Sequence, residues 1–257
     1  MSLLRNLVLF VLGLVLPAAA AEFRWSERLA PGQTLEIKGV SGDIRAVAAP
    51  GDQAQVVARK HARRSDPAAV EIRVVPHAGG VTICALYPGG SWRRPNECVP
   101  GSGGRMETQD NDVSVDFEVQ VPAGVRFVGR TVNGEVEGRD LPGDAEAASV
   151  NGDVEVAAAG LVRARSVNGS VRVELGKTNW EGELSFETVN GSLTVTLPDT
   201  ASTEVKARTV NGDIRTDFPL AVRGGLVGHK LEGTLGSGGR SLSLETVNGS
   251  VHLRKVR

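Results

Sequence analysis

The residues of this chain with the most specific chemistry are its two cysteines, Cys84 and Cys98. Two thiols can close a disulfide, or their thiolates can bind a metal ion. His61 and His77 precede them and no closely spaced histidine pair follows, so the set matches none of the common zinc-site spacings. A disulfide is therefore the simpler interpretation if the chain reaches an oxidising compartment.

The N-terminal residues indicate export. Arg5 is followed by an apolar run over residues 7–16 and by four alanines at 18–21, which is the pattern of a secretory signal peptide and its cleavage site. The apolar run is too short to anchor the chain stably in a bilayer. We expect residues 1–21 to be a signal peptide, and the mature protein to be periplasmic or extracellular at the cell surface, without a transmembrane anchor. The two cysteines are then expected to be joined.

The segment between the cysteines is the strongest candidate for binding. It holds the aromatic and basic residues Tyr87, Trp92, Arg93 and Arg94 among glycines and prolines that indicate irregular backbone. Constrained loops commonly carry function, and ring faces beside guanidinium groups suit sugars, anionic polymers or a protein partner. The alternative is a capping loop in which Trp92 folds back onto the strands.

Other polar clusters resemble known sites less closely. Residues 110–112 with Asp116 could bind calcium, but the spacing of a calcium loop is missing, which favours a solvated strand edge. Residues 101–105 and 236–240 both read Gly-Ser-Gly-Gly-Arg but lack the Lys-Ser/Thr ending of a phosphate-binding loop, so we expect flexible connections. The basic run at 59–64 is interpreted as a solvated face.

Catalytic motifs are absent from the sequence. Residues 39–43 read Gly-Val-Ser-Gly-Asp and miss the Gly-X-Ser-X-Gly pattern of a hydrolase, and the four histidines form no metalloprotease pair. The net charge of -1 gives no indication of nucleic-acid binding. We expect a protein that is not an enzyme, with no metal, no cofactor and no nucleic-acid partner.

One phrase, Thr/Ser-Val-Asn-Gly followed by Asp, Glu or Ser, recurs through the second half of the chain. Its asparagines are Asn133, Asn151, Asn168, Asn190, Asn211 and Asn248. A period of about 20 residues is typical of a solenoid, whose units bury their apolar faces against their neighbours. The asparagines could form a ligand array, but turn chemistry alone explains Asn-Gly, since both residues tolerate positive φ. We expect turn residues whose amides stack in an internal hydrogen-bonded ladder.

The residues after each Asn-Gly alternate between apolar and polar, which is the period of a β-strand. Asn-Gly could close antiparallel hairpins, or it could bend one strand into the next around a coil. The position three before each asparagine holds, in sequence order, Arg130, Ala148, Arg165, Glu187, Arg208 and Glu245. This alternation of sign favours the coil, because equivalent side chains become neighbours in a parallel stack.

The sequence therefore predicts an all-β fold, a single-stranded, β-helix-like β-solenoid with about 20 residues per coil and Asn-Gly turns. One domain is expected over residues 22–257, with irregular coils and the disulfide loop at 22–121 and regular Val-Asn-Gly repeats at 122–257. An early copy of the phrase begins at Val40, and a decayed copy at 227–232 is expected to supply a further coil.

These features together resemble a known family. The leader, the entry segment at 35–44, the phrase Phe-Glu-Val-Gln-Val-Pro-Ala-Gly at 117–124 and the repeats are similar to the bacterial putative-adhesin family of β-strand-repeat domains. The resemblance covers most of the mature chain. It implies a β-solenoid of unknown function in a cell-envelope protein and brings no catalytic residues. The loop bounded by the cysteines departs from the family pattern.

We therefore expect an exported, non-catalytic structural or binding protein of the cell envelope. Its expected partners are envelope polysaccharide or an envelope protein. One alternative is an accessory component of envelope-stress sensing that acts through a protein partner. The other is a polysaccharide-active β-helix enzyme, although outward charges of mixed sign give no acidic groove.

Overall fold

The structure is a computed structural model that describes residues 22–91, 94–176, 178–180, 182–224 and 228–256. The expected signal peptide lies outside the described residues. Within them, the regular structure is β-strand apart from one short 3-10 helix, η1 (Pro67–Ala69), so the all-β prediction is confirmed. No helix in this part of the chain has the length and hydropathy to span a bilayer.

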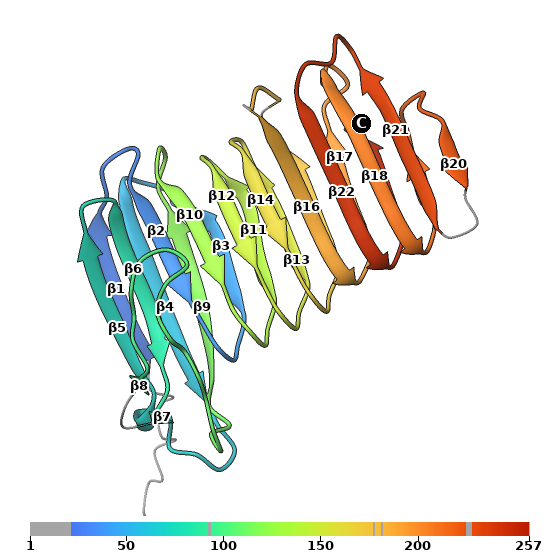
Figure 1. Ribbon diagram of the computed structural model, residues 1–257. Helices are drawn as coiled ribbons and strands as arrows, with labels where there is room; N and C mark the ends of the chain where they lie inside the picture. Colours follow the sequence, from blue (N-terminus) through green and yellow to red (C-terminus); the bar gives the residue numbers. More distant parts are fainter. Residues whose placement is uncertain (1–21, 92–93, 177, 181, 225–227, 257) are drawn as a thin grey trace, which may run out of the picture.

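Two large sheets run along the length of the molecule (Figure 1). Among the described residues, the ten strands of sheet A lie in the order β1 (Glu22–Arg28), β4 (Gln53–His61), β9 (Ser114–Val121), β3 (Ile44–Ala48), β11 (Val136–Leu141), β13 (Val154–Ala158), β15 (Val171–Leu175), β17 (Leu193–Leu197), β23 (Val251–Lys255) and β19 (Ile214–Thr216). The eleven described strands of sheet B lie in the order β20 (Val222–Gly224), β21 (His229–Leu235), β18 (Thr203–Asn211), β22 (Ser241–Asn248), β16 (Glu183–Asn190), β14 (Val162–Arg165), β12 (Ala145–Ala148), β10 (Arg126–Arg130), β2 (Thr34–Lys38), β6 (Gly80–Leu86) and β5 (Glu71–His77). A small hairpin joins β7 (Gly90–Ser91) to β8 (Arg94–Pro95).

Through its middle part the chain alternates between the two sheets, with β10 in sheet B, β11 in sheet A, and so on to β17. Each of these strands pairs in parallel with the equivalent strand of the next repeat, so that Glu137 lies beside Glu155, which lies beside Arg172. Among the described strands, antiparallel pairs occur only at the two ends of the stack and in the small hairpin. Equivalent residues of successive repeats therefore form rows along the molecule.

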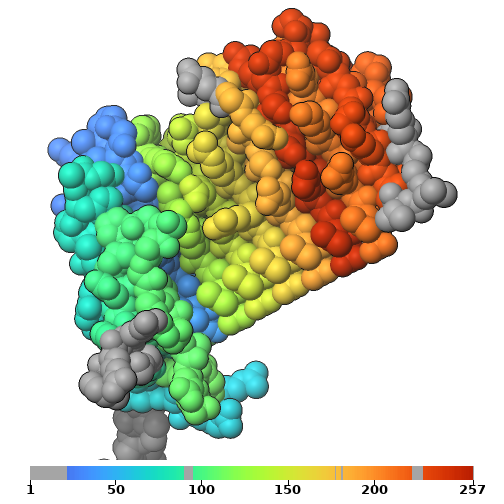
Figure 2. Space-filling view, viewed as in Figure 1, coloured from blue at the N-terminus to red at the C-terminus, as the bar shows by residue number. Residues whose placement is uncertain are grey.

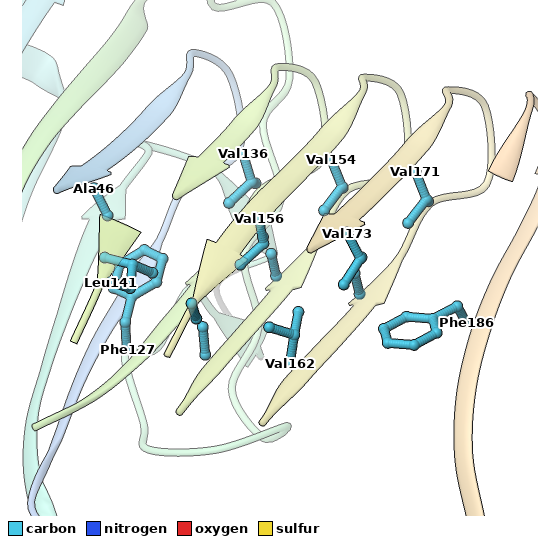
Figure 3. Packing of buried hydrophobic residues seen from close by; sticks show 14 of the residues in the cluster. Ala46, Phe127, Val136, Leu141, Val154, Val156, Val162, Val171, Val173 and Phe186 are labelled. Carbon is cyan, nitrogen blue, oxygen red and sulfur yellow. The ribbon is translucent and has the colours of Figure 1, made fainter. Parts of the chain in front are cut away.

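The core consists of such rows between the two sheets. Val136, Val154 and Val171 are fully buried and lie side by side on neighbouring strands of sheet A (Figure 3). Phe127 and Phe186 reach the same core from sheet B. Because each row is one side chain wide, branched aliphatic residues fill the core and few large rings are needed.

The last two strands of the chain do not close the stack. β22 lies between β16 and β18, and β23 lies between β17 and β19. The expected further coil at 227–232 is wrong, because residues 229–232 belong to β21, which runs antiparallel to β18; Val227 lies outside the described residues. Instead, β21 pairs antiparallel with β18 and β20 pairs with β21. These two strands cover the edge of β18, which would otherwise be open to pairing.

The first residue of the repeated phrase, Thr or Ser, is buried and bonds to the neighbouring repeat. The hydroxyl of Ser166 donates to the carbonyl oxygen of Gly152 at 2.8 Å, and that of Thr188 donates to Gly169 at 2.7 Å. All six copies make the equivalent bond to a glycine carbonyl. These hydroxyl groups form a ladder of hydrogen bonds along the stack, in addition to the asparagine ladder expected from the sequence.

The asparagine amides form the outer ladder. Each Nδ2 donates to the Oδ1 of the next asparagine at 2.7–2.8 Å, in the order Asn211, Asn248, Asn190, Asn168, Asn151 and Asn133. Ser41, from the early copy, forms a parallel bridge with Asn133 and extends the row. The ladder is exposed to solvent rather than internal, because the chain turns outward after the buried Thr or Ser.

Glycine is required in the phrase because neighbouring backbones approach closely. A Cβ atom on Gly169 would lie 2.1 Å from the carbonyl oxygen of Gly152, and the six equivalent glycines all meet such an oxygen at 2.0–2.1 Å. The asparagines do not use positive φ, since Asp110 and Asp140 are the non-glycine residues of the described chain that do. Close stacking, and not the tolerance of positive φ by asparagine, explains this Asn-Gly pair.

We predict that Gly169→Ala destabilises the protein by about 1–3 kcal/mol, as overpacking does, because the new methyl group meets backbone that cannot move aside. Gly51→Ala is the matched control, since nothing lies within 4 Å of its Cβ position, and we expect a change within about 0.5 kcal/mol. Urea unfolding followed by circular dichroism measures both. Equal stabilities of the two variants would contradict the close-approach argument.

We further predict that Thr188→Val costs more stability than Asn190→Ala. The first variant removes the buried hydroxyl that donates to the carbonyl oxygen of Gly169, at about 1–3 kcal/mol, whereas the exposed amide of Asn190 can be replaced by water at about 0.5–1 kcal/mol. Thermal and urea unfolding of both variants give the ranking. A larger loss for Asn190→Ala would show that the outer ladder, and not the hydroxyl ladder, holds the repeats together.

Candidate functional site

Cys84 and Cys98 are joined by a disulfide with a Cα–Cα distance of 5.9 Å. Cys84 is fully buried on β6, so the bridge ties the loop between the cysteines to a strand of sheet B. Within the loop, β7 and β8 form the small hairpin, with Ser91 paired to Arg94. The loop is therefore fixed at both ends to the scaffold.

Tyr87, one of the candidate binding residues, packs into the protein. Its side chain is 4% exposed, and its hydroxyl donates to the carbonyl oxygens of Val113 at 2.9 Å and Ser41 at 3.2 Å. Burial raises the pKa of Tyr87 to about 12. The position of Tyr87 speaks against its predicted binding role, because this ring packs against the core and its hydroxyl joins two segments of backbone.

The other three predicted binding residues stay untested. Trp92 and Arg93 lie outside the described residues. Arg94 begins β8, and its backbone pairs with that of Ser91. The hypothesis of a binding loop therefore remains a prediction for these three side chains.

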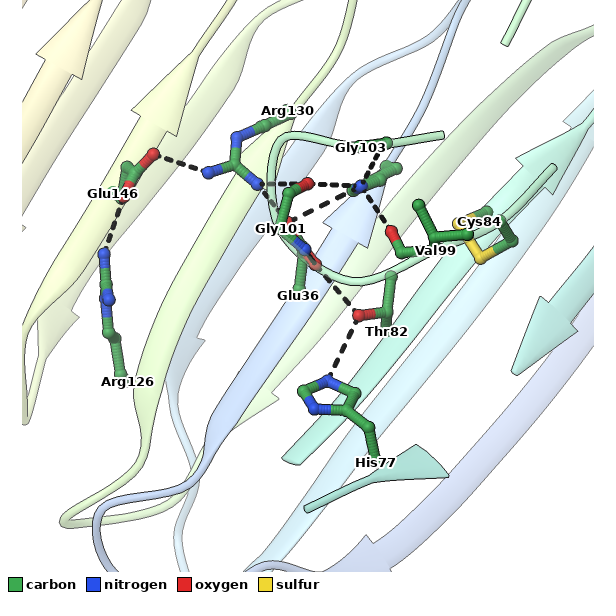
Figure 4. A network of polar contacts seen from close by, with 12 residues as sticks. Glu36, His77, Thr82, Cys84, Val99, Gly101, Gly103, Arg126, Arg130 and Glu146 are labelled. Atoms are coloured by element: carbon green, nitrogen blue, oxygen red, sulfur yellow. Dashed lines mark hydrogen bonds and ion pairs between the residues drawn. A yellow bond between two sulfur atoms is a disulfide. The ribbon is translucent and has the colours of Figure 1, made fainter. Parts of the chain in front are cut away.

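The segment after the loop, which includes Val99, Gly101 and Gly103 in Figure 4, is held by a buried lysine. Lys38 is 6% exposed, and its ammonium group donates to the carbonyl oxygens of Val99 at 2.6 Å and Gly103 at 3.1 Å, and also to that of Gly101. Desolvation by burial lowers the pKa of Lys38, while the charge of Glu36 raises it. The expectation that residues 101–105 form a flexible connection is wrong, because the backbone wraps around this cation.

Glu36 links the wrapped segment to the repeats. Its carboxylate is 3% exposed and accepts from the Thr82 hydroxyl and the Gly101 amide, both at 2.9 Å, and from the Arg130 guanidinium. Arg130 also donates to Glu146 at 2.6 Å. The network fixes residues 99–103 against the outer face of sheet B, where they border the first regular repeats.

A row of valines runs along that same face. The valine of each phrase follows the buried Thr or Ser and points outward, and five of them are 39–41% exposed: Val150, Val167, Val189, Val210 and Val247. They are among the most exposed large apolar side chains of the described residues. The signal for them in the sequence is strand alternation, which places each valine on the same side as the residue two positions earlier; that residue is charged in every repeat except the one with Ala148.

The valine row and the charged row border a groove of about 610 Å³. The charged row reads, in spatial order, Arg130, Ala148, Arg165, Glu187, Glu245 and Arg208. The strict alternation of sign expected from the sequence is wrong, because the insertion of β22 places Glu245 beside Glu187. The groove therefore has a basic end, an acidic middle and a basic residue at the far end.

Beside the groove, a smaller hollow of about 270 Å³ opens where Ala148 interrupts the row of long side chains. Arg163, Arg165 and Ser185 line it, and Ser102 of the wrapped segment stands at its edge. In Figure 2 the green segment around residue 100 stands above the sheet surface next to the yellow-green strands. The Lys38 network thus builds a rigid wall at the N-terminal end of the grooved face.

The remaining polar clusters have structural partners. Asp112 accepts from the backbone amides of Arg64 and Ser65, and Asp116 accepts from the amide of Asp43. Hydrogen bonds from Ser65 lower the pKa of Asp112. In the part of the chain that the structure describes, no group of three or more His, Cys, Asp or Glu could hold a metal ion.

The basic run at 59–64 and the second glycine-rich segment are also anchored. Arg59 forms an ion pair with Glu118, and His61 lies 3.3 Å from Asp116. Arg240 donates to the carbonyl oxygen of the buried Trp180 at 2.8 Å. Opposite charges on β9 therefore partly balance the basic run, and residues 236–240 are not a loose connection.

The fold and the groove together define the class of protein: it is an elongated all-β scaffold with two mostly parallel sheets and an open groove along one side. Residues 130–254, which contain the rows that form this groove, match the family model described as Toastrack DUF4097. These residues, just under half of the chain, are similar to this family of domains of unknown function. No curated protein matches the sequence.

Two solved structures of bacterial proteins align with most of this chain. A putative cell adhesion protein from Clostridium sporogenes aligns with 91% of this chain and 100% of its own, at 12% identity and a TM-score of 0.45. A putative adhesin from Bacteroides fragilis aligns with 91% of this chain and 97% of its own, at 12% identity and a TM-score of 0.37.

Tyr87 permits a direct test of its burial, because it is the only tyrosine of the chain. We predict that absorbance at 295 nm shows a single tyrosinate transition near pH 12 in the folded protein and near pH 10 in urea. Since the pKa is raised in the folded state, the stability linked to Tyr87 is complete below about pH 10 and is lost as the pH rises toward 12. A transition near pH 10 in folded protein would place the hydroxyl in solvent.

Proposed function

We propose that the protein is an exported, non-catalytic binding scaffold of the cell envelope. The signal-peptide pattern of residues 1–21 and the disulfide, which persists in oxidising compartments, support export. The scaffold is a single-domain, single-stranded β-solenoid over residues 22–257, with about 20 residues per coil and Asn-Gly turns. The hydrogen bonds between asparagines 17, 18 and 22 residues apart support this coil length.

The observation that carries the binding role is the exposed valine row. Threonine would serve an exposed strand position as well as valine, because both are β-branched. Five copies nevertheless keep an aliphatic side chain about 40% exposed at the same position of successive repeats. A contiguous apolar stripe bordered by charged residues is typical of an interaction surface.

The chemistry of the groove favours a protein partner. Among the described residues, its lining contains valine, threonine, serine, arginine and glutamate but no aromatic residue, whereas sugar-binding surfaces commonly use aromatic faces. The charged row would pair with a partner segment that is acidic opposite Arg130 and Arg165 and basic opposite Glu187 and Glu245. Envelope polysaccharide is the alternative ligand, and the predicted loop residues Trp92, Arg93 and Arg94 would be its place of contact.

The envelope-sensing alternative also requires a protein partner, since the protein would then act through a membrane protein that the groove recognises.

The polysaccharide-active alternative rests on a different observation. Glu187 and Glu245 lie in register on neighbouring strands, and paired carboxylates are the catalytic groups of glycoside hydrolases. Depolymerisation of a polysaccharide panel by the native chain, lost in Glu187→Gln, would establish that activity and overturn the non-catalytic proposal.

The binding role is tested by a charge inserted into the valine row. We predict that the double variant Val167→Glu, Val189→Glu keeps its unfolding free energy within about 1 kcal/mol, because both positions are exposed. The immobilised variant should nevertheless lose at least tenfold in binding to a defined protein partner that the native chain retains from solubilised envelope fractions. Partner identity is established by mass spectrometry, and affinity is then measured with the purified partner.

The matched control is Thr194→Glu, Thr196→Glu, which adds the same charge to the outer face of sheet A. This control should bind as the native chain does. Equal affinity of both double variants would exclude the groove as the binding surface. Binding that survives protease treatment of the envelope fraction but is lost after glycan digestion would replace the protein partner with polysaccharide.

A further inference from the structure

Strand β1 forms an open edge of sheet A. It pairs with β4 along seven residues, from Glu22 opposite Arg59 to Arg28 opposite Gln53, and no strand of the described chain lies on its other side. A strand has backbone N–H and C=O groups on both sides, so half of those on β1 face outward without a strand partner. The seven-residue edge is therefore available for pairing with another strand.

The other edges are less suited to pairing. β5, at the edge of sheet B at the same end of the molecule, contains Pro76, which has no N–H to donate. At the opposite end, β19 and β20 have three residues each. Proline and short length are common devices against unwanted strand addition. β1 has neither device.

The end of the core beside β1 is also incompletely covered. Phe23 and Trp25 pack against the core but stay only partly buried, and Ile72 and Val74 on β5 do the same in sheet B. Two of the few aromatic side chains of the protein thus lie at a sheet edge that has no neighbour. A second strand beside β1 would cover both of them.

The sequence of β1 is complementary to itself. We propose that two copies of this chain pair antiparallel through β1, with the two-fold axis at Trp25. In this register Glu22 of each copy lies opposite Arg28 of the other, and the two Trp25 residues lie opposite each other. Opposite charges and aromatic pairs directly across two strands both stabilise a sheet. The partner is a second copy because this match uses the same seven residues on both sides.

Neighbouring registers lack this match. Outward-facing backbone groups occur on every second residue, so a two-fold antiparallel pair must be centred on a residue and not between two. Centring on Arg24 places the two Arg24 side chains opposite each other, and centring on Ser26 places Arg24 opposite Arg28. Like charges directly opposite each other are destabilising. Only the register centred on Trp25 pairs all seven residues without such a contact.

The proposal does not depend on the binding function of the groove. Pairing joins the edges of the two copies of sheet A into one continuous sheet, while the groove lies on the outer face of sheet B. Each dimer would then carry two grooves. A partner with two equivalent binding segments would gain affinity from binding both at once.

Disulfide trapping tests the register. Trp25→Cys, in the full chain expressed with its leader, should form a covalent dimer under mild oxidation, because residues on the axis have Cα atoms about 4.5–5.5 Å apart. Ser26→Cys is the matched control. Its two copies would lie roughly 8 Å apart, two residues out of register, which is beyond disulfide reach. Non-reducing gel electrophoresis should show at least a tenfold higher dimer yield for Trp25→Cys.

Charge reversal and sedimentation provide the second measurement. Adding Arg28→Glu to Trp25→Cys should reduce the dimer yield severalfold, and adding Glu22→Arg as well should restore it, with folding of each variant verified by circular dichroism. The native chain should sediment as a dimer at micromolar concentration. A native chain that sediments as a monomer at 100 μM, with equal cross-linking at positions 25 and 26, would overturn the proposal.

Discussion

The structure depends on how closely neighbouring backbones approach at the glycine of each repeat. There the carbonyl oxygen of one glycine lies about 2 Å from where a Cβ of the next would stand, and the same oxygen accepts a hydrogen bond from the hydroxyl of the buried Thr or Ser. A slip of one residue would bring a side chain against that oxygen and exchange the inner and outer faces of the strand. This contact therefore fixes the register, and the valine, charged and asparagine rows follow from it.

The irregular N-terminal part depends on a different interaction, the burial of Lys38 and Glu36. A buried charge is tolerated only when its donors or acceptors are satisfied, and here backbone carbonyls surround the ammonium group while Thr82, Gly101 and Arg130 donate to the carboxylate. The glycine-rich backbone can wrap around Lys38 because it carries few side chains. The resulting wall stands beside the first regular repeats, so a buried ion pair shapes the exposed groove.

The sheet edges at the two ends of the stack are protected in different ways. At the C-terminal end, β21 and β20 turn back antiparallel and cover sheet B, while the last strands of the sequence, β22 and β23, are placed inside the stack. At the N-terminal end, β5 ends the edge of sheet B with a proline, whereas β1 leaves sheet A open. The asymmetry makes the N-terminal end the one at which two copies can meet.

The sequence by itself determined the all-β class, the strand period and the set of residues that become equivalent, because a side chain's alternation and a repeat's spacing are local properties. It also indicated the disulfide partners, since only two cysteines are present. The tertiary structure alone decided that Glu245 lies beside Glu187, that Tyr87 is buried and that residues 99–103 enclose Lys38. These are contacts between segments far apart in the chain. Such contacts form according to which strand edges are unpaired and which buried charges need partners once the strands have stacked. Neither can be read from a local sequence pattern.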